Sequence, residues 1–187
     1  AINQSDAITA VSDDLIKETR QLLHIEKQID RIYNFVDERV YYPRNGQAQR
    51  KDFAREHEKI MLHISNFRPV KRVLDVLDIF HEVVNKIPAK LLLIGDGPDL
   101  SKVQWKVEQL GLHDHVIYLG KQDDVAQIIS VADLLLLPSE KESFGLVALE
   151  AMACGVPTIG SNTGGIPEVV AHGETGYLSP VGEISEM

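Results

Sequence analysis

Short apolar runs alternate with segments of helical apolar spacing from about residue 60 to the end of the chain. In residues 71–85, Val73, Leu77 and Phe80 recur on one helix face, whereas residues 90–94 form a compact apolar run. Short apolar runs closed by glycine or proline favour buried strands. We expect strands at 61–65, 90–94, 115–119, 133–137, 156–160 and 175–178, and helices at 71–85, 100–110, 123–131, 144–153 and 166–172.

The six expected strands are nearly continuous apolar runs, without alternating polar positions. Such strands are buried on both faces, as in parallel sheets that carry helices on each side. Strands that alternate with helices indicate a doubly wound, Rossmann-like α/β fold with a parallel sheet. In that fold ligands bind beyond the carboxyl ends of the strands. We therefore expect the site in the loops 66–70, 95–98, 120–123, 138–145 and 160–167.

The first 45 residues lack this regular alternation. Residues 6–11 and 29–36 have strand signals, and Ser12 is a suitable N-cap for a helix at 13–23. The polar, charged stretch 44–59 is expected to be an exposed helix or a linker.

The charge balance argues against a polyanionic partner. The 187 residues carry 28 acidic and 19 basic side chains, a formal charge of −9, which repels a nucleic-acid backbone. The longest apolar runs, 91–94 and 134–137, are far shorter than the roughly 18 residues of a membrane span. The single cysteine, Cys154, excludes an internal disulfide and fits a reducing cytoplasm. The histidines lack metal-ligand spacing, so we expect no metal site.

One acidic residue interrupts the helix expected at 144–153. Apolar residues cover every face of that helix, which predicts a helix buried all round, and Glu150 lies within it. A buried carboxylate is costly unless a partner satisfies it. A ligand with two hydroxyls would satisfy it, and so would an arginine or a backbone partner; the sequence leaves both possibilities open.

Glu142 lies eight positions before Glu150, in the loop that leads into the same helix. Gly145 lets a ligand approach the backbone closely. The free N–H groups of the first helical turn favour an anion such as phosphate. Together these features form a candidate cradle for a sugar hydroxyl, a phosphate and a ribose.

Three basic residues, Arg68, Lys71 and Arg72, fall in the loop after the strand expected at 61–65. Cations at such a place can neutralise a diphosphate and stabilise it as a leaving group. The alternative is a solvated basic patch on an acidic surface.

Two glycine-rich turns carry weaker signals. The turn 95–98, which includes Gly97, resembles a dinucleotide fingerprint, but Leu100 occupies the place of the third glycine. We interpret this segment as a tight turn that lines the cleft. Gly164 and Gly165 open another expected helix, where they can present amides to a ligand or simply form a tight turn.

The motifs occur in the order seen in a known family. Glu142 and Glu150, with Ser-Phe-Gly-Leu after the first of them, resemble the E-x7-E signature of the retaining GT-B glycosyltransferases of family 4. Residues 32–37 resemble the interdomain segment of that family, with Phe35 where the family has glycine. Further segments that resemble the C-terminal domain of the family are 95–98, 132–133, 138–139, 150–157, 164–168 and 173–178.

The resemblance implies a role for each matching residue. Glu150 would bind the ribose hydroxyls, and Glu142 would hold a hydroxyl of the donor sugar. The backbone N–H groups of Phe144, Gly145 and Leu146 would contact the sugar and the diphosphate. The family needs no metal and no other cofactor for transfer.

Two cations and the base-binding loop follow from the same resemblance. Lys71 matches the phosphate-binding lysine of the family. The arginine of the family lies five positions earlier, where this sequence has Asn66, so we assign the second cation to Arg68. Lys121 and Gln122 lie where the family holds the nucleotide base. No catalytic residue is assigned, and Lys71, Arg68 and Glu142 are expected to support the transition state.

The resemblance also divides the chain. Residues 1–35 would be the end of an N-terminal acceptor domain with the interdomain segment, and residues 36–187 a C-terminal nucleotide-sugar-binding domain truncated at its end. We expect a fragment of a cytoplasmic enzyme that binds a nucleotide-sugar donor but transfers little or no sugar by itself. Within the family, residues 66–72 and 33–37 resemble members that transfer N-acetylglucosamine from its UDP donor to L-malate in bacillithiol biosynthesis.

Two other functions stay open at this point. A nicotinamide-dependent Rossmann oxidoreductase would need the complete G-x-G-x-x-G and an acidic residue roughly 20 positions later. A non-catalytic nucleotide-sugar-binding module would contain the same binding residues without transfer activity.

Overall fold

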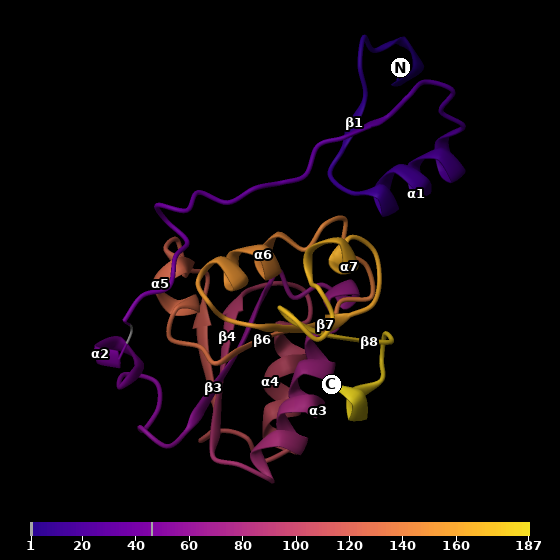
Figure 1. The fold of residues 1–187 in the computed structure, drawn as a ribbon. Helices are drawn as coiled ribbons and strands as arrows, with labels where there is room; N and C mark the ends of the chain where they lie inside the picture. The colour runs from indigo at the N-terminus through magenta and orange to yellow at the C-terminus, as the bar shows by residue number, and fades with distance from the viewer. Residues whose placement is uncertain (1, 46) are drawn as a thin grey trace.

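Six parallel strands form the central sheet in the computed structural model, which describes residues 2–45 and 47–187 (Figure 1). The strands lie in the order β5-β4-β3-β6-β7-β8, and all neighbours pair in parallel. Each apolar run that predicts a strand after residue 60 is confirmed within a few residues. The strands are β3 (Lys59–Ser65), β4 (Ala89–Gly95), β5 (Val116–Gly120), β6 (Leu134–Leu137), β7 (Thr158–Ser161) and β8 (Gly176–Ser179).

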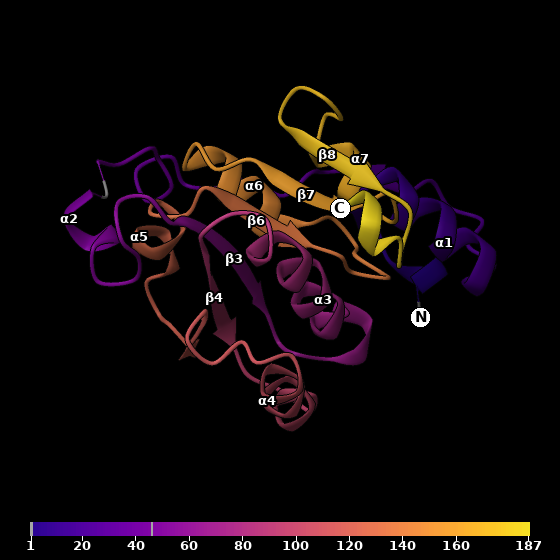
Figure 2. The same cartoon turned by 90° about the horizontal axis from the view of Figure 1, so that it is seen from below.

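Helices cover both faces of this sheet (Figure 2). Ile60 and Leu62 pack into a core with α5, α6 and α7, whereas Met61 packs into a second core with α3 and α4. Alternate side chains of a strand point to opposite faces of the sheet. Because helices cover both faces here, the positions that point to either face are apolar. The doubly wound α/β fold is therefore confirmed. The helices are α3 (Val73–Val84), α4 (Leu100–Gln109), α5 (Val125–Ile129), α6 (Leu146–Ala153) and α7 (Ile166–Val169), with the 3-10 helices η2 (Pro69–Lys71) and η3 (Ile184–Glu186).

Two helix predictions need correction. The helix expected at 166–172 ends at Val169, because Val170 is extended and His172 pairs with Gly176 as a parallel bridge. The prediction that α6 is buried all round is wrong, since Leu146 is 40% exposed. A helix that lies on one face of a sheet buries only the side toward the strands. Among the described residues, no helix is long and apolar enough to cross a membrane.

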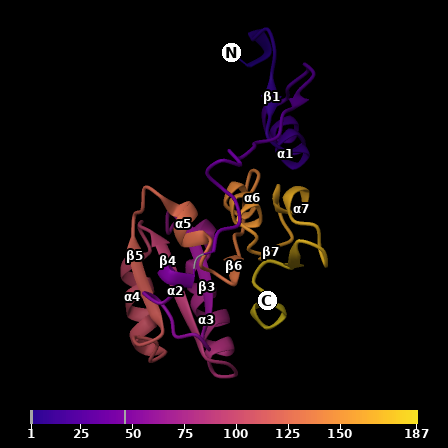
Figure 3. The same ribbon diagram turned by 60° about the vertical axis from the view of Figure 1, so that its left-hand side comes forward.

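The N-terminal segment forms a small separate unit (Figure 3). It contains η1 (Ile2–Gln4), β1 (Thr9–Ala10), α1 (Asp13–Leu23) and β2 (Asp30–Arg31), and β1 pairs with β2 in parallel. The strand signals at 6–11 and 29–36 shrink to two residues each, because the pairing extends no further. The expected N-cap is confirmed: the Ser12 hydroxyl accepts the Leu15 N–H at 3.0 Å. A long segment then joins this unit to the sheet.

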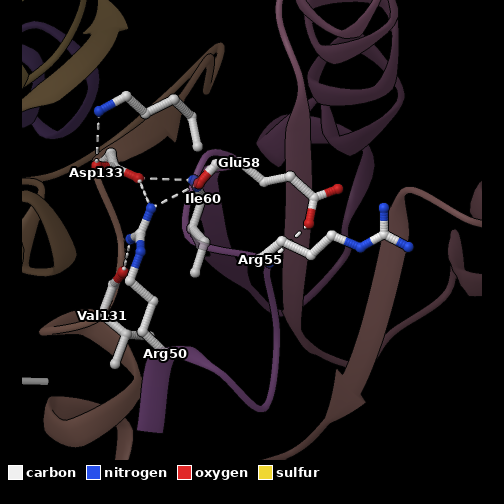
Figure 4. A network of polar contacts seen from close by, with 7 residues as sticks. Arg50, Arg55, Glu58, Ile60, Val131 and Asp133 are labelled. Carbon is white, nitrogen blue, oxygen red and sulfur yellow. Dashed lines mark hydrogen bonds and ion pairs between the residues drawn. The ribbon is translucent and has the colours of Figure 1, made fainter. Parts of the chain in front are cut away.

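The polar stretch 44–59 is largely exposed, as predicted, but it is also anchored to the sheet, which was not predicted. It contains α2 (Gln47–Arg50), and the Arg50 guanidinium donates to the Glu58 carbonyl oxygen at 2.8 Å and pairs with the Asp133 carboxylate at 2.6 Å (Figure 4). These partners lie at the amino ends of β3 and β6. The stretch therefore packs at the end of the sheet opposite the carboxyl-end loops.

Candidate functional site

The direction of strand addition reverses between β3 and β6, at the centre of the sheet. From β3 the chain builds outward through β4 and β5, and then returns to add β6, β7 and β8 on the other side. The loops at the carboxyl ends of β3 and β6 diverge at such a switch point, where doubly wound sheets bind ligands. The two loops meet where the Glu140 N–H donates to the Val70 carbonyl oxygen at 2.8 Å.

Lys71 and Glu142 face each other across this switch point. The Lys71 ammonium forms an ion pair with Oε1 of Glu142, and the two side chains are 20% and 15% exposed. The Ser139 hydroxyl donates to the same oxygen at 3.3 Å. The structure thus brings together the cation and the carboxylate that the sequence places in different loops. Their partial removal from water strengthens the interaction between them.

The other two cations of the β3 loop have different surroundings. Arg72 pairs with Asp75 of α3, with Nη2 2.5 Å from the carboxylate. The Arg72 charge is therefore neutralised at the start of α3. Arg68 is exposed, and its carbonyl oxygen accepts the Lys71 N–H at 2.8 Å. Within the described part of the chain, no carboxylate pairs with the Arg68 side chain. Arg68 is therefore available to an anionic ligand beside Lys71.

His63 supports this loop from inside the sheet, which the sequence analysis missed. The ring is fully buried; Nδ1 donates to the Leu136 carbonyl oxygen at 2.9 Å, and Nε2 accepts the Ser65 hydroxyl at 2.8 Å. Ser65 in turn accepts the Phe67 N–H at 3.2 Å, where the backbone has φ 36°. Burial lowers the pKa of His63 to about 4, so the ring is neutral near pH 7. A polar residue inside an apolar run was the available signal.

The glycines of the turn after β4 allow two loops to pack backbone against backbone. A Cβ atom on Gly95 would lie 1.7 Å from the Ser65 carbonyl oxygen, and one on Gly97 would lie 1.9 Å from the Asn66 carbonyl oxygen. No side chain fits at either place. This packing favours the interpretation of residues 95–98 as a tight turn beside the cleft.

Lys121 and Gln122 follow β5 at the rim of the same edge. The Lys121 ammonium is 3.7 Å from the Asp96 carboxylate and is mostly exposed. Gln122 donates its side-chain amide to the Leu119 carbonyl oxygen at 2.6 Å. The loops after β4 and β5 therefore lie close enough to form one wall of the site.

The N-terminus of α6 directly follows the loop that carries Glu142. Gly145, with φ 94°, is the N-cap, and its carbonyl oxygen accepts the Ala148 N–H at 2.9 Å. The N–H groups of the first two helical residues, Leu146 and Val147, have no acceptor within the helix. Phe144 is buried, and its ring packs against Tyr33 with centroids 5.8 Å apart.

Glu150 on α6 has a partner that the sequence did not reveal. The Tyr41 hydroxyl, from the segment that joins the two units, lies near the Glu150 carboxylate. Burial raises the pKa of Glu150, and the Tyr41 hydroxyl partly offsets that rise. Burial and the Glu150 charge raise the pKa of Tyr41 to about 12. The carboxylate keeps further acceptor positions for ligand hydroxyls, because each oxygen has two lone pairs.

The turn after β7 packs onto the Glu142 loop. The Gly165 N–H donates to the Glu142 carbonyl oxygen at 2.9 Å, and a Cβ atom on Gly164 would lie 2.1 Å from that oxygen. The Gly165 amide is therefore committed to the protein, which favours the tight-turn alternative. Across residues 2–45 and 47–187, no group of three or more His, Cys, Asp or Glu side chains is placed to hold a metal ion.

The fold is that of the C-terminal half of GT-B glycosyltransferases, with a cation, two carboxylates and a helix N-terminus at the switch point of its sheet. The chain belongs to the family of group 1 glycosyl transferases, which matches residues 45–187. The matched region covers most of the chain and includes all the carboxyl-end loops of the sheet described above.

Curated relatives include N-acetyl-alpha-D-glucosaminyl L-malate synthase of Bacillus anthracis, 55% identical over 183 residues, which are 97% of this chain and 48% of that protein. D-inositol 3-phosphate glycosyltransferase of Mycobacterium marinum is 31% identical over 190 residues, 95% of this chain and 39% of that protein. The chain spans about half or less of the length of these relatives.

Among solved structures, Anabaena Alr3699/HepE in complex with UDP-glucose matches with a TM-score of 0.90 and 27% identity, over 98% of this chain and 52% of that chain. Sucrose-phosphate synthase from Thermosynechococcus elongatus matches with a TM-score of 0.89 and 27% identity, over 98% of this chain and 47% of that chain.

Proposed function

We propose that this chain is the donor-binding part of a retaining glycosyltransferase that transfers N-acetylglucosamine from UDP-N-acetylglucosamine to L-malate in bacillithiol biosynthesis. The observation that carries donor binding is the Lys71–Glu142 pair at the switch point, with Glu150 on the helix that follows. The 55% identity to the Bacillus anthracis malate synthase supports the choice of sugar and acceptor. The likeness to a structure that holds UDP-glucose supports a UDP-sugar donor.

In this proposal the carboxylates hold hydroxyl groups at the two ends of the donor. Glu150 accepts from the ribose hydroxyls, and Glu142 accepts from a hydroxyl of the sugar. The N–H groups of Phe144, Gly145 and Leu146 contact the sugar and the diphosphate, where a helix N-terminus favours negative charge. Each carboxylate keeps its protein partner, because a carboxylate accepts several hydrogen bonds.

The cations act on the leaving group. As the bond from the sugar to the diphosphate breaks, negative charge grows on the diphosphate oxygens. Lys71 and Arg68 stabilise that charge from the β3 loop, and such prearranged groups are often the largest contribution to catalysis. A hydroxyl of the acceptor then attacks the same face of the sugar from which the diphosphate departs, and its proton passes to the departing diphosphate.

The base and the acceptor occupy opposite parts of the cleft. The loops with Gly97, Lys121 and Gln122 form the wall beside the nucleotide base. Residues 36–187 form the donor domain, and residues 1–35 belong to the end of the acceptor domain and the interdomain segment. L-malate would bind to that acceptor domain, and the enzyme would act in the cytoplasm.

Calorimetry with this chain tests the proposal. UDP and UDP-N-acetylglucosamine are expected to bind, NAD is not, and Glu150→Ala is expected to lose donor affinity. Binding of NAD without UDP would favour the oxidoreductase alternative and contradict the proposal. Unchanged affinity in Glu150→Ala would remove the ribose role of that residue.

Transfer is tested in the whole protein that contains this chain. We expect release of UDP from UDP-N-acetylglucosamine in the presence of L-malate, and none with this chain alone. Donor binding without any transfer to small acids by the whole protein would favour the non-catalytic binding module.

A further inference from the structure

The N-terminus of α1 is capped by a residue from the far end of the chain. The Glu168 carboxylate on α7 accepts the Asp13 N–H at 2.9 Å through one oxygen and the Asp14 N–H at 3.0 Å through the other. The first N–H groups of a helix have no acceptor within the helix itself. Glu168 supplies that acceptor from the other structural unit. Figures 1 and 3 show α1 beside α7 at this junction.

Ser12 links the same helix end to the backbone of the donor loop. Its hydroxyl accepts the Leu15 N–H at 3.0 Å and donates to the Ser143 carbonyl oxygen at 2.6 Å. Ser12 is fully buried, so water does not replace either bond. One hydroxyl therefore caps α1 and fixes the peptide group between Ser143 and Phe144.

Tyr33 adds a third contact between the two units. Its hydroxyl lies near the Glu168 carboxylate and lowers the pKa of that group, and its ring packs against Phe144 with centroids 5.8 Å apart. The Arg31 guanidinium lies 4.4 Å from the centroid of the Tyr33 ring and also pairs with Asp13. The cap, the aromatic contact and the cation thus form one connected group around Glu168.

The charge of Glu168 suits this position. Burial raises the pKa of this carboxyl, but the N–H donors of Asp13 and Asp14, the Tyr33 hydroxyl and the Arg31 charge together lower it. Negative charge at a helix N-terminus is stabilising, because the exposed N–H groups carry partial positive charge. The carboxylate therefore binds the helix end as an anion.

We propose that Glu168 is a positioning residue for the donor loop formed by residues 142–145. It fixes the N-terminus of α1, and Ser12 and Tyr33 transmit that position to Ser143 and Phe144. The inference rests on the proposed function, in which this loop holds the sugar and the diphosphate. It follows that Glu168 affects recognition of the sugar end of the donor more than recognition of the ribose, which depends on Glu150.

A role limited to capping α1 would leave the donor loop unchanged. The first test measures backbone order without any ligand, from 15N relaxation of this chain. Glu168→Gln is expected to lower the order parameters of Ser143, Phe144 and Gly145 from about 0.85 toward about 0.6. Glu174→Gln is the matched control, because this substitution removes the same charge from an exposed turn six residues after Glu168.

Ser12→Ala provides a second variant, since it removes the hydroxyl that reaches Ser143 and leaves Glu168 in place. It is expected to loosen the same loop. If Glu168→Gln disturbs only the first turn of α1, and Ser143 to Gly145 keep their order, the proposal is overturned.

The second test compares two ligands by calorimetry. Glu168→Gln is expected to weaken UDP-N-acetylglucosamine at least fivefold and UMP less than twofold. An equal loss for both ligands contradicts the proposal, because it indicates general destabilisation of the site. If the unmodified chain binds neither ligand, the proposed function fails, while the ligand-free relaxation test still decides the positioning role.

Discussion

The Lys71 ammonium and the Glu142 carboxylate form an ion pair between the loops that follow β3 and β6. Both side chains are mostly buried, so each charge depends on the other for its compensation. Replacing Lys71 by Met is expected to cost about 1–3 kcal/mol of stability, because Glu142 is left without its partner. Adding Glu142→Gln to Lys71→Met should recover part of that loss. Urea unfolding of the two single variants and the double variant measures the coupling.

The same substitution tests the phosphate role of Lys71. A hydrogen bond to a charged group contributes about 1.5–3 kcal/mol, so UDP affinity should fall about 10- to 100-fold in Lys71→Met. Lys86→Met is the control, since Lys86 is an exposed partner of Glu82 on α3. Equal effects of the two substitutions on UDP affinity would contradict the assignment.

Glu150 is expected to cost stability in the unliganded chain. Its pKa is raised by burial in the folded state, so the folded chain disfavours the ionised form above that pKa. Glu150→Gln should therefore raise Tm at pH 7, and this gain should disappear in acid, where Glu150 is protonated in both states. UDP affinity should fall in the same variant. Thermal unfolding at several pH values checks the sign, and a lower Tm at pH 7 would count against it.

Tyr41 is expected to tune the acid limit of donor binding. Its hydroxyl lowers the pKa of Glu150, so Tyr41→Phe should raise that pKa further. Loss of UDP affinity on acidification should then begin at a higher pH than in the unmodified chain. Calorimetry from pH 8 downward measures the onset, and Tyr42→Phe, which changes an exposed neighbour, should leave it in place.

Buried His63 should give the chain a pH-dependent stability. Its pKa falls from 6.5 to about 4 on folding, so the folded state binds fewer protons than the unfolded state between these values. The contribution of the neutral ring to the free energy of unfolding is complete above pH 6.5. About 3 kcal/mol of this free energy is lost as the pH falls toward 4. His63→Asn should flatten this part of the curve, whereas exposed His113→Asn should not. The two slopes, measured by urea unfolding, are compared with that of the unmodified chain.

Gly97 should tolerate no side chain. Gly97→Ala places a Cβ atom against the Asn66 carbonyl oxygen and should cost more than about 2 kcal/mol, a range typical of steric strain in packed regions. Gly111→Ala meets no atom within 4 Å, and only its left-handed backbone, φ 64°, costs about 1 kcal/mol. Similar losses for the two variants would show that the loop contact at Gly97 relaxes easily.

The sequence predicts the sheet well because strand formation here depends on local patterns. Continuous apolar runs such as Leu91–Ile94 indicate a strand and its burial together. Helix ends are harder to predict from the sequence, because backbone conformations such as the left-handed one of Arg72 depend on the packing of the whole loop. Lys71 and Glu142 are recognisable because each stands in a loop that follows an expected strand, β3 or β6, and such loops lie at the carboxyl edge of a parallel sheet.

Partners distant in the sequence could not be predicted from it. Glu150 is a conspicuous acid in an apolar helix, yet nothing local identifies Tyr41 as its partner. Asp133 likewise accepts the Ile60 N–H at 2.7 Å and pairs with Arg50, more than 70 residues before it. Such pairs arise only when the topology brings distant segments of the chain together.

The central pairing of the sheet also has a consequence for synthesis on the ribosome. Met61 of β3 pairs with Leu134 of β6, so one edge of β3 stays open until β6 has been made. At roughly 5–20 residues per second, this interval is about 4–15 s. During that time the nascent chain exposes an apolar strand edge of the kind that recruits other chains. Slow translation between the two strands should therefore increase the dependence of this protein on chaperones.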